Sequence, residues 1–214
     1  MNADDIAQFL RAHPQFFDQH PQLLESIYVP HPHGGRAIPL TERQIVGLRE
    51  KVKLLEGRLE EFIRFGEDND AIGEKVHRLS LALIGARDFG AAAQALYFHL
   101  REDFAVPHVA LRVWGRALPD GAPEAGPVEA ELADRAGTMG GPQCGPAAGN
   151  PFLGWFREAQ EHIRSVALVP LGETRTLGLL ALGSEDPQRF YPEMGTIYLR
   201  RIGELTAGAL AARA

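Results

Sequence analysis

The chain has 214 residues, of which 45% are hydrophobic and 23% charged, a composition typical of globular proteins rather than of disordered ones. Its 22 basic and 28 acidic residues give a net charge of −6, which disfavours binding to the phosphate backbone of nucleic acid. The single cysteine, Cys144, excludes an intramolecular disulfide and a cysteine-based zinc or iron–sulfur site. This length accommodates one domain of ordinary size and an extension.

The N-terminal region, residues 1–40, is expected to hold short helices and then a loop. Asn2 or Asp4 can cap a first helix. Residues 13–19 and 20–26 form a small tandem repeat, in which His-Pro-Gln precedes a pair of bulky apolar residues, and each proline suits the start of a short helical turn. The prolines and glycines of residues 29–39 predict a loop.

Residues 41–85 carry the clearest pattern, which predicts one long coiled-coil helix. Its apolar residues recur with alternating gaps of three and four, as in a heptad seam: Ile45, Leu48, Val52, Leu55, Leu59 and Phe62. After Phe62 one irregular step shifts the register, and the stripe continues through the polar Asn69 to Leu83. A helix over 41–84 would be about 65 Å long at ~1.5 Å per residue, too long for a small domain to cover. We therefore expect a second copy of the chain to pair along this seam, with Asn69 fixing the register.

Four glycines interrupt this pattern, and each costs roughly 1 kcal/mol relative to alanine inside a helix. They stand at Gly47, Gly57, Gly66 and Gly73. Two interpretations stay open at this point. The region is an ordinary imperfect coiled coil, or its weakness serves to carry a signal along the helix.

The remaining region, residues 86–214, changes to a mixed pattern of helices and strands. Asp88 is expected to cap a helix that runs to Leu100. We then expect a strand over 106–114, a loop over 115–127, a weak helix over 128–136, a Gly/Pro-rich loop over 137–150, an aromatic helix over 151–160, strands over 163–171 and 176–184, and a last helix opened by Pro192. This order predicts an α+β fold with an antiparallel sheet. Because the two hairpin strands are almost continuously apolar, helices are expected on both faces of that sheet.

The hairpin and its surroundings resemble the C-terminal half of a GAF domain. The first strand ends in Pro170-Leu171, the second reads Gly-x-Leu-x-Leu over residues 178–182, and Phe190 precedes the last helix. The resemblance implies a GAF-like antiparallel sheet flanked by helices, preceded by the helical arm of residues 1–40 and the coiled-coil helix of residues 41–85.

The chain as a whole resembles a bacterial family known as domain of unknown function family 484. The features that carry the resemblance include His13-Pro14-x-Phe16-Phe17, the Pro30-His31-Pro32 loop, Gln44 with Leu48-Arg49, Asn69, Cys144-Gly145, Leu182-Gly183-Ser184 and Met194-Gly195-Thr196. They span nearly the entire chain. This resemblance implies no known activity.

The resemblance to GAF domains also implies a place for a small molecule, between the sheet and the segments that cover it. The cover here would be residues 115–162, and the candidate lining residues are Trp114, Cys144, Phe152, Trp155 and Phe156. The alternative is that these aromatic side chains simply fill the core. Cys144 could sense oxidants if its thiolate were stabilised and accessible, or it could be a small buried apolar residue.

The known chemistries of GAF domains find no match in this sequence. No asparagine precedes a lysine, as the cyclic-nucleotide motif requires, and the surroundings of Cys144 do not resemble those of a bilin attachment site. One cysteine cannot complete the disulfide cycle of a methionine sulfoxide reductase. The histidines at 13, 20, 31 and 33 lack metal-ligand spacing, so we expect no metal and no other cofactor. Since no catalytic constellation is present either, we expect no enzymatic activity.

These expectations combine into one functional hypothesis and one alternative. The hypothesis is a cytoplasmic, homodimeric sensor or adaptor, since we find neither a signal peptide nor an apolar stretch of membrane-spanning length. A small molecule would act by favouring one of two packings. The alternative is a scaffold for an unknown protein partner, with a vestigial, filled pocket. Neither reading involves nucleic acid or a membrane.

Overall fold

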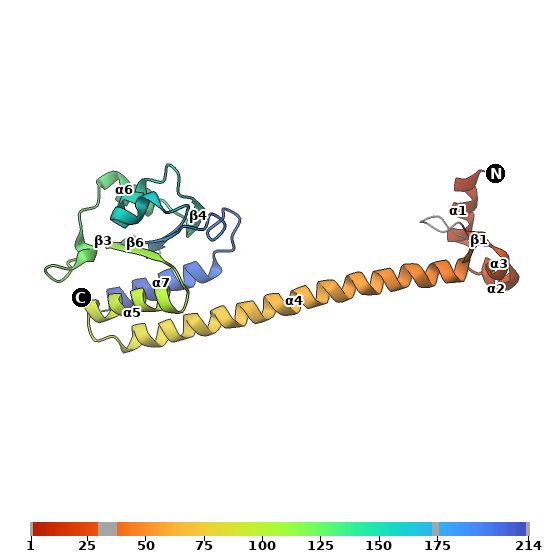
Figure 1. Ribbon diagram of the computed structural model, residues 1–214, viewed down its shortest axis with the longest axis horizontal. Coiled ribbons are helices and arrows are strands. Elements are labelled where there is room, and N and C mark those ends of the chain that lie inside the picture. The colour runs from red at the N-terminus through yellow and green to blue at the C-terminus, as the bar shows by residue number, and fades with distance from the viewer. Residues whose placement is uncertain (1, 30–37, 173–175, 213–214) are drawn as a thin grey trace. The chain divides into compact units, whose positions relative to one another are not determined.

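The computed structural model describes residues 2–29, 38–172 and 176–212 (Figure 1). Its helices are α1 (Ala3–Ala12), α2 (Phe16–Gln19), α3 (Pro21–Ser26), α4 (Leu40–Gly85), α5 (Phe89–Glu102), α6 (Ala130–Gly137) and α7 (Ile197–Ala211), with 3-10 helices η1 (Pro123–Ala125) and η2 (Pro151–Glu161). Its strands are β1 (Tyr28–Val29), β2 (Ile38–Pro39), β3 (His108–Val113), β4 (Gln143–Pro146), β5 (Ser165–Leu171) and β6 (Gly178–Ser184). The chain divides into two compact units, Met1–Glu67 and Asp68–Ala214, and α4 contributes to both.

The N-terminal unit begins with short helices, as the sequence predicts. Asn2 caps α1 through a reciprocal pair of hydrogen bonds with Asp5, each 2.8 Å long. Pro21 opens α3, but Pro14 opens no helix, because α2 starts two residues later with Gln15 at its N-cap. The loop predicted over 29–39 is wrong at its two ends, where β1 and β2 pair antiparallel, while residues 30–37 lie outside the described part of the chain.

The long helix is confirmed as one continuous element, α4. It begins one residue before the predicted start and ends at Gly85.

The C-terminal unit is built on a four-stranded antiparallel sheet with the order β3-β6-β5-β4. The predicted hairpin is confirmed as β5 and β6, which pair from Ser165 opposite Ser184 to Leu171 opposite Gly178. Most of its turn, residues 173–175, lies outside the described residues. The α+β class with helices on both faces of an antiparallel sheet is therefore confirmed.

Strand β4 is an element that the sequence does not predict, since residues 137–150 read as a loop. It pairs with β5 alone, so Cys144 lies opposite Ala167 and Gly145 opposite Val166. Glycine and proline are poor strand formers, but an edge strand tolerates them because only one of its edges needs hydrogen bonds. The pairing partner, not the local sequence, makes β4 a strand.

Two hydrophobic cores sandwich the sheet. On one face α5, α7 and the last turns of α4 pack against it, around Leu79, Leu96, Leu111 and Leu182. On the other face α6 and η2 pack around Phe152, Ala136 and Leu179. Side chains alternate along the strands, so successive residues of β5 enter opposite cores. The nearly continuous apolar reading of the hairpin follows from this double burial.

Helix α7 starts later than the sequence predicts. It begins at Ile197 rather than at Pro192, because Met194 donates its backbone N–H to Tyr191 and the chain turns there first. Ile197, at its first turn, is exposed. The buried face instead includes the small residues Gly203 and Ala207, which let the helix lie close to the sheet.

Two glycines of α7 give a matched prediction. A Cβ at Gly203 would lie 2.6 Å from Val169 Cγ1, whereas a Cβ at Gly208 would meet nothing within 4 Å. Gly203→Ala is therefore expected to lower the free energy of unfolding by about 1–3 kcal/mol through overpacking. Gly208→Ala is expected to raise it by up to about 1 kcal/mol through helix propensity. Urea titrations of both variants measure the two changes, and equal effects would contradict the close approach at Gly203.

Candidate functional site

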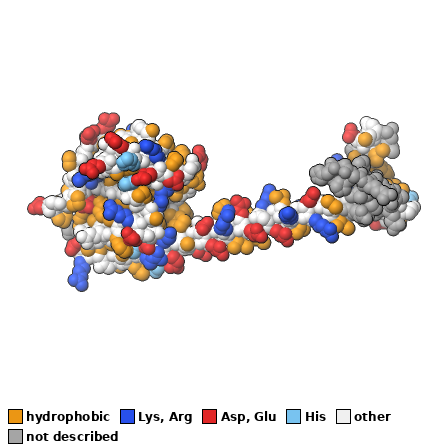
Figure 2. Space-filling view, in the orientation of Figure 1, with side chains coloured by type: hydrophobic (Ala, Val, Ile, Leu, Met, Phe, Trp, Pro, Cys, Tyr) orange, Lys and Arg blue, Asp and Glu red, His pale blue; other side chains and the backbone are white. Residues whose placement is uncertain are grey.

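The first half of α4 presents an apolar seam without a partner among the described residues. Its members are between 48% and 70% exposed: Ile45, Leu48, Val52, Leu55, Leu59 and Phe62. Charged side chains surround them along the helix (Figure 2). Six large apolar side chains at heptad spacing, each 48% exposed or more, show the pattern that is typical of the contact face of a coiled coil.

The second register of the stripe has a different role. Val76, Leu79 and Leu83 are buried in the core of their own C-terminal unit, against α5 and α7. The prediction that the seam offers these positions to a second copy is therefore wrong: the domain itself covers them. Asn69 stays exposed, and its backbone carbonyl accepts a hydrogen bond of 3.0 Å from the Tyr198 hydroxyl. Burial of the stripe begins only at Ile72, beyond the irregular step after Phe62, since Phe65 is still 49% exposed.

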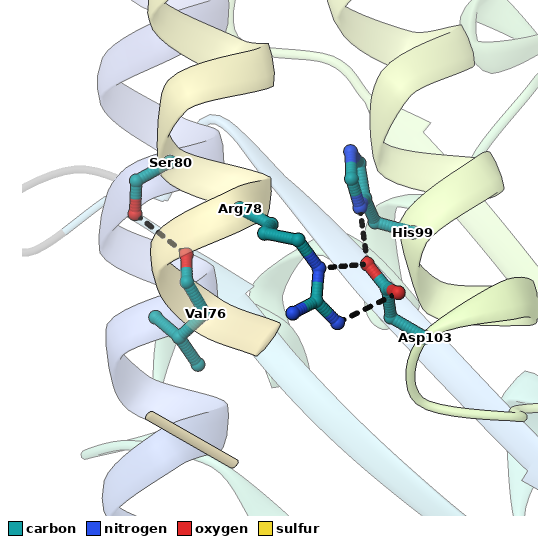
Figure 3. A network of polar contacts seen from close by, with 5 residues as sticks. All are labelled: Val76, Arg78, Ser80, His99 and Asp103. Atoms are coloured by element: carbon teal, nitrogen blue, oxygen red, sulfur yellow. Dashed lines mark hydrogen bonds and ion pairs between the residues drawn. The ribbon is translucent and has the colours of Figure 1, made fainter. Parts of the chain in front are cut away.

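A polar network fastens the last turns of α4 to the end of α5 (Figure 3). The Arg78 guanidinium donates to both carboxylate oxygens of Asp103, at 2.9 and 3.4 Å. His99 Nδ1 lies 2.5 Å from the same carboxylate. The hydrogen bond from Arg78, and then the contact with His99, lower the pKa of Asp103 below its usual range.

Asp103→Asn is expected to weaken the acid dependence of stability. Because the pKa of Asp103 is lower in the folded chain, the unfolded chain takes up the proton first. The stabilisation is thus complete above the unfolded pKa, near the ordinary value of 3.8, and is lost as pH falls through the lower folded pKa. Urea midpoints measured from pH 6 to pH 2 should fall less steeply in the variant. Asp120→Asn, at an exposed aspartate, serves as the control and should match the unaltered protein.

Three of the predicted pocket residues pack together on the face of the sheet that α6 and η2 cover. Phe152 and Phe156 are buried in the core beneath η2, and the rings of Phe152 and Trp155 meet edge to face at 5.1 Å. Trp114 packs at the border of the same cluster. The sequence left open whether these aromatic side chains line a pocket or fill the core. The burial of Phe152 and Phe156 matches side chains that fill the core.

Cys144 lies apart from these aromatic residues. Since it stands opposite Ala167 in the β4–β5 ladder, its side chain joins the core on the α5/α7 face of the sheet, and the aromatic cluster occupies the other face. Burial raises the pKa of the Cys144 thiol, which disfavours the reactive thiolate. The expectation that Cys144 shares one pocket with the aromatic residues is therefore wrong.

A cleft of about 470 Å³ lies beside β3, and Trp155 and Phe156 are among the residues that line it. Its buried acid, Glu124, accepts a hydrogen bond of 3.1 Å from the Tyr97 hydroxyl. The guanidinium of Arg112 lies 5.8 Å from the ring of Trp155, a cation–π distance. Sequence reasoning missed this group. The sequence offers one signal for this group, the charge of Arg112 within a mostly apolar strand. No feature of the sequence around Glu124 marks that residue as buried or functional.

Arg112 of this group also contacts the backbone at β3, one of the two edge strands of the sheet. Arg112 donates to the backbone carbonyls of Leu111 and Pro123, at 2.9 and 3.2 Å. Burial and the nearby Glu124 carboxylate raise the pKa of the Tyr97 hydroxyl. Because β3 is an edge strand, the bond from Arg112 occupies a carbonyl of Leu111 that another strand could otherwise use.

The described part of the chain holds neither a cluster of potential metal ligands nor a helix suited to span a membrane. Among those residues no three His, Cys, Asp or Glu side chains gather as metal ligands would. His13 instead contacts the Phe9 carbonyl at 3.0 Å, while His31 and His33 fall outside the described residues. None of the described helices has the length and apolar character that crossing a lipid bilayer demands.

Comparison with known proteins places the chain in a family. The model of a family described as "Protein of unknown function, DUF484" matches residues 1–212. The chain belongs to the DUF484 family. The sequence-based resemblance is thereby confirmed, and it covers the helical arm, α4 and the C-terminal unit together.

A relative and a solved structure add two further likenesses to this DUF484 chain. An uncharacterized protein of Salmonella typhimurium, YigA, is 26% identical over 204 residues, which cover 92% of this chain and 86% of that protein. A crystal structure described as the nlh2 GAF domain of A. Aeolicus in an inactive state is 13% identical, with a TM-score of 0.47. That match covers 68% of this chain and 99% of the GAF chain. A likeness at this score carries no weight for function.

Proposed function

We propose that this DUF484 protein is a non-catalytic, GAF-like adaptor that acts as a homodimer joined through the α4 seam. The observation that carries the proposal is the exposure of the seam from Ile45 to Phe62. Full burial of a Val, Leu, Ile or Phe side chain stabilises by about 1.5–3 kcal/mol, so a partner that covers this face gains substantial free energy. A second copy supplies an identical seam without requiring another protein.

Sedimentation equilibrium of the full chain tests the dimer directly. At micromolar concentration the expected mass is twice the 23.4 kDa of one chain. A mass of one chain at that concentration would refute the homodimer. A mass dependent on concentration would give the dissociation constant, which the later variants need as their reference.

A sensor role is the second candidate, and the cleft beside β3 favours it. Trp155, Arg112 and Glu124 offer an aromatic ring, a cation and an acid on one opening. Native mass spectrometry of the purified protein distinguishes the two roles. A small molecule that co-purifies, and is lost on Trp155→Ala, supports the sensor, whereas a chain free of any ligand supports the adaptor.

The remaining parts of the proposal come from the sequence. The absence of a recognisable catalytic motif supports a non-catalytic role, and the single thiol fits a reducing cytoplasm. An unknown protein partner would complete the adaptor. Nucleic acid is a poor candidate for that partner because of the net charge of −6.

A further inference from the structure

We propose that the two copies pair in parallel and in register over residues 45–62, with Lys51 of each chain against Glu56 of the partner subunit. This inference rests on the proposed homodimer and goes further by fixing its orientation. It concerns the seam side chains and the charges beside them, all of which belong to the described part of α4.

The types of residue within the seam favour this orientation. The gaps place Ile45, Val52 and Leu59 at the a positions of successive heptads. The d positions are Leu48, Leu55 and Phe62. β-Branched residues at a with leucine at d are the combination that favours parallel, two-stranded coiled coils. The first two heptads follow this combination fully.

The charges beside the seam favour the same orientation. In a parallel pair, a g residue faces the e residue five positions later on the other helix. Lys51 occupies g and Glu56 occupies e, so two-fold symmetry creates two attractive pairs. Both side chains are exposed, and neither forms an ion pair within the described residues of its own chain. The other g and e contacts each join a charge to a neutral residue: Gln44 with Arg49, and Arg58 with Ile63.

An antiparallel pair brings different charges together. If the same seam residues are in contact, the g residues of one helix face the g residues of the other, and the e residues face the e residues. Lys51 would then lie near Arg58 of the partner subunit, a repulsive pair that occurs twice. The attraction of Arg49 for Glu56 would offset this repulsion and leave no net gain. The parallel arrangement has the attractive pairs without the repulsive ones.

A charge exchange in the full chain tests the orientation. The same substitution at Lys51 should raise the dissociation constant of a parallel dimer and lower that of an antiparallel one. In the parallel pair Lys51→Glu places two glutamates together, and the dissociation constant should rise roughly fivefold at low salt. Glu56→Lys should do the same, and the double variant Lys51→Glu/Glu56→Lys should restore the original value. In an antiparallel pair Lys51→Glu would instead tighten the dimer, by replacing the repulsion with Arg58. A tighter dimer, or a double variant no better than the singles, would overturn the proposal.

Disulfide formation gives an independent readout. In a Cys144→Ser background, Leu55→Cys should cross-link two identical chains on oxidation, because residue 55 meets itself only in a parallel, in-register pair. Cross-linking found only between Val52→Cys and Leu55→Cys chains would show the antiparallel arrangement. The Cys144→Ser chain alone should not cross-link. If the unaltered protein sediments as a monomer, the homodimer itself fails; if it is a dimer that fails these tests, only the orientation does.

Discussion

Replacing Leu55 by aspartate is expected to convert the proposed homodimer into a monomer. Leu55 stands in the middle of the α4 seam, so its loss removes apolar burial in both chains and places two carboxylates in the interface. Burial of each leucine is worth about 2 kcal/mol, which predicts a rise in the dissociation constant of roughly 1,000-fold. Sedimentation equilibrium at micromolar concentration should then give the mass of one chain.

The neighbouring leucine provides a matched control. Leu54 is 57% exposed and Leu55 is 52% exposed, so neither side chain is buried within its own chain. Leu54 lies outside the heptad seam, however, and Leu54→Asp should leave the dimer intact. Both substitutions carry the same cost in helix propensity and the same change in charge. Dissociation by both variants, or by neither, would contradict the assignment of the seam.

Phe152→Ala is expected to be the most damaging substitution in the cover of the sheet. The side chain is 0% exposed and packs against Trp155 within the second core. Truncation of a fully buried phenylalanine leaves a cavity and typically costs about 3–5 kcal/mol of unfolding free energy. Thermal or urea unfolding of the full chain measures this loss.

Phe98 serves as the control for this prediction. It belongs to α5 of the same unit but is 60% exposed, so Phe98→Ala should change the free energy of unfolding by much less, about 0.5 kcal/mol or below. A small effect of Phe152→Ala would mean that the cover tolerates a void there. That result would favour a sensor whose ligand enters beneath η2 over an adaptor with a filled core.

Periodic patterns account for what the sequence predicts well. The alternating gaps from Ile45 to Phe62 predict α4 and its exposed seam because a helix repeats every 3.6 residues wherever it lies. Asp88 predicts the start of α5 because its side chain accepts a hydrogen bond from the third residue onward, Ala91. The apolar strands β5 and β6 follow from the same kind of local rule. In each case the residues that carry the signal are close together in the chain.

The sequence-based predictions are wrong where a segment pairs or packs with residues that lie far away in the sequence. Strand β4 exists because β5 offers it hydrogen bonds, although its own glycine and proline oppose a strand. After one irregular step at Phe62 the stripe continues with the same alternating gaps, so spacing alone does not reveal that Val76 and Leu83 face their own domain. A periodic pattern shows which face is apolar but not what covers it.

The sequence by itself determined the long helix, the α+β class, the hairpin and the membership of the DUF484 family. Only the tertiary structure decided that Cys144 and the aromatic cover lie on opposite faces of the sheet, and that Tyr97, Arg112 and Glu124 meet beside β3. The physical reason is that local geometry depends on neighbours along the chain. The position of a side chain across a sheet depends on pairing registers and packing that join distant segments.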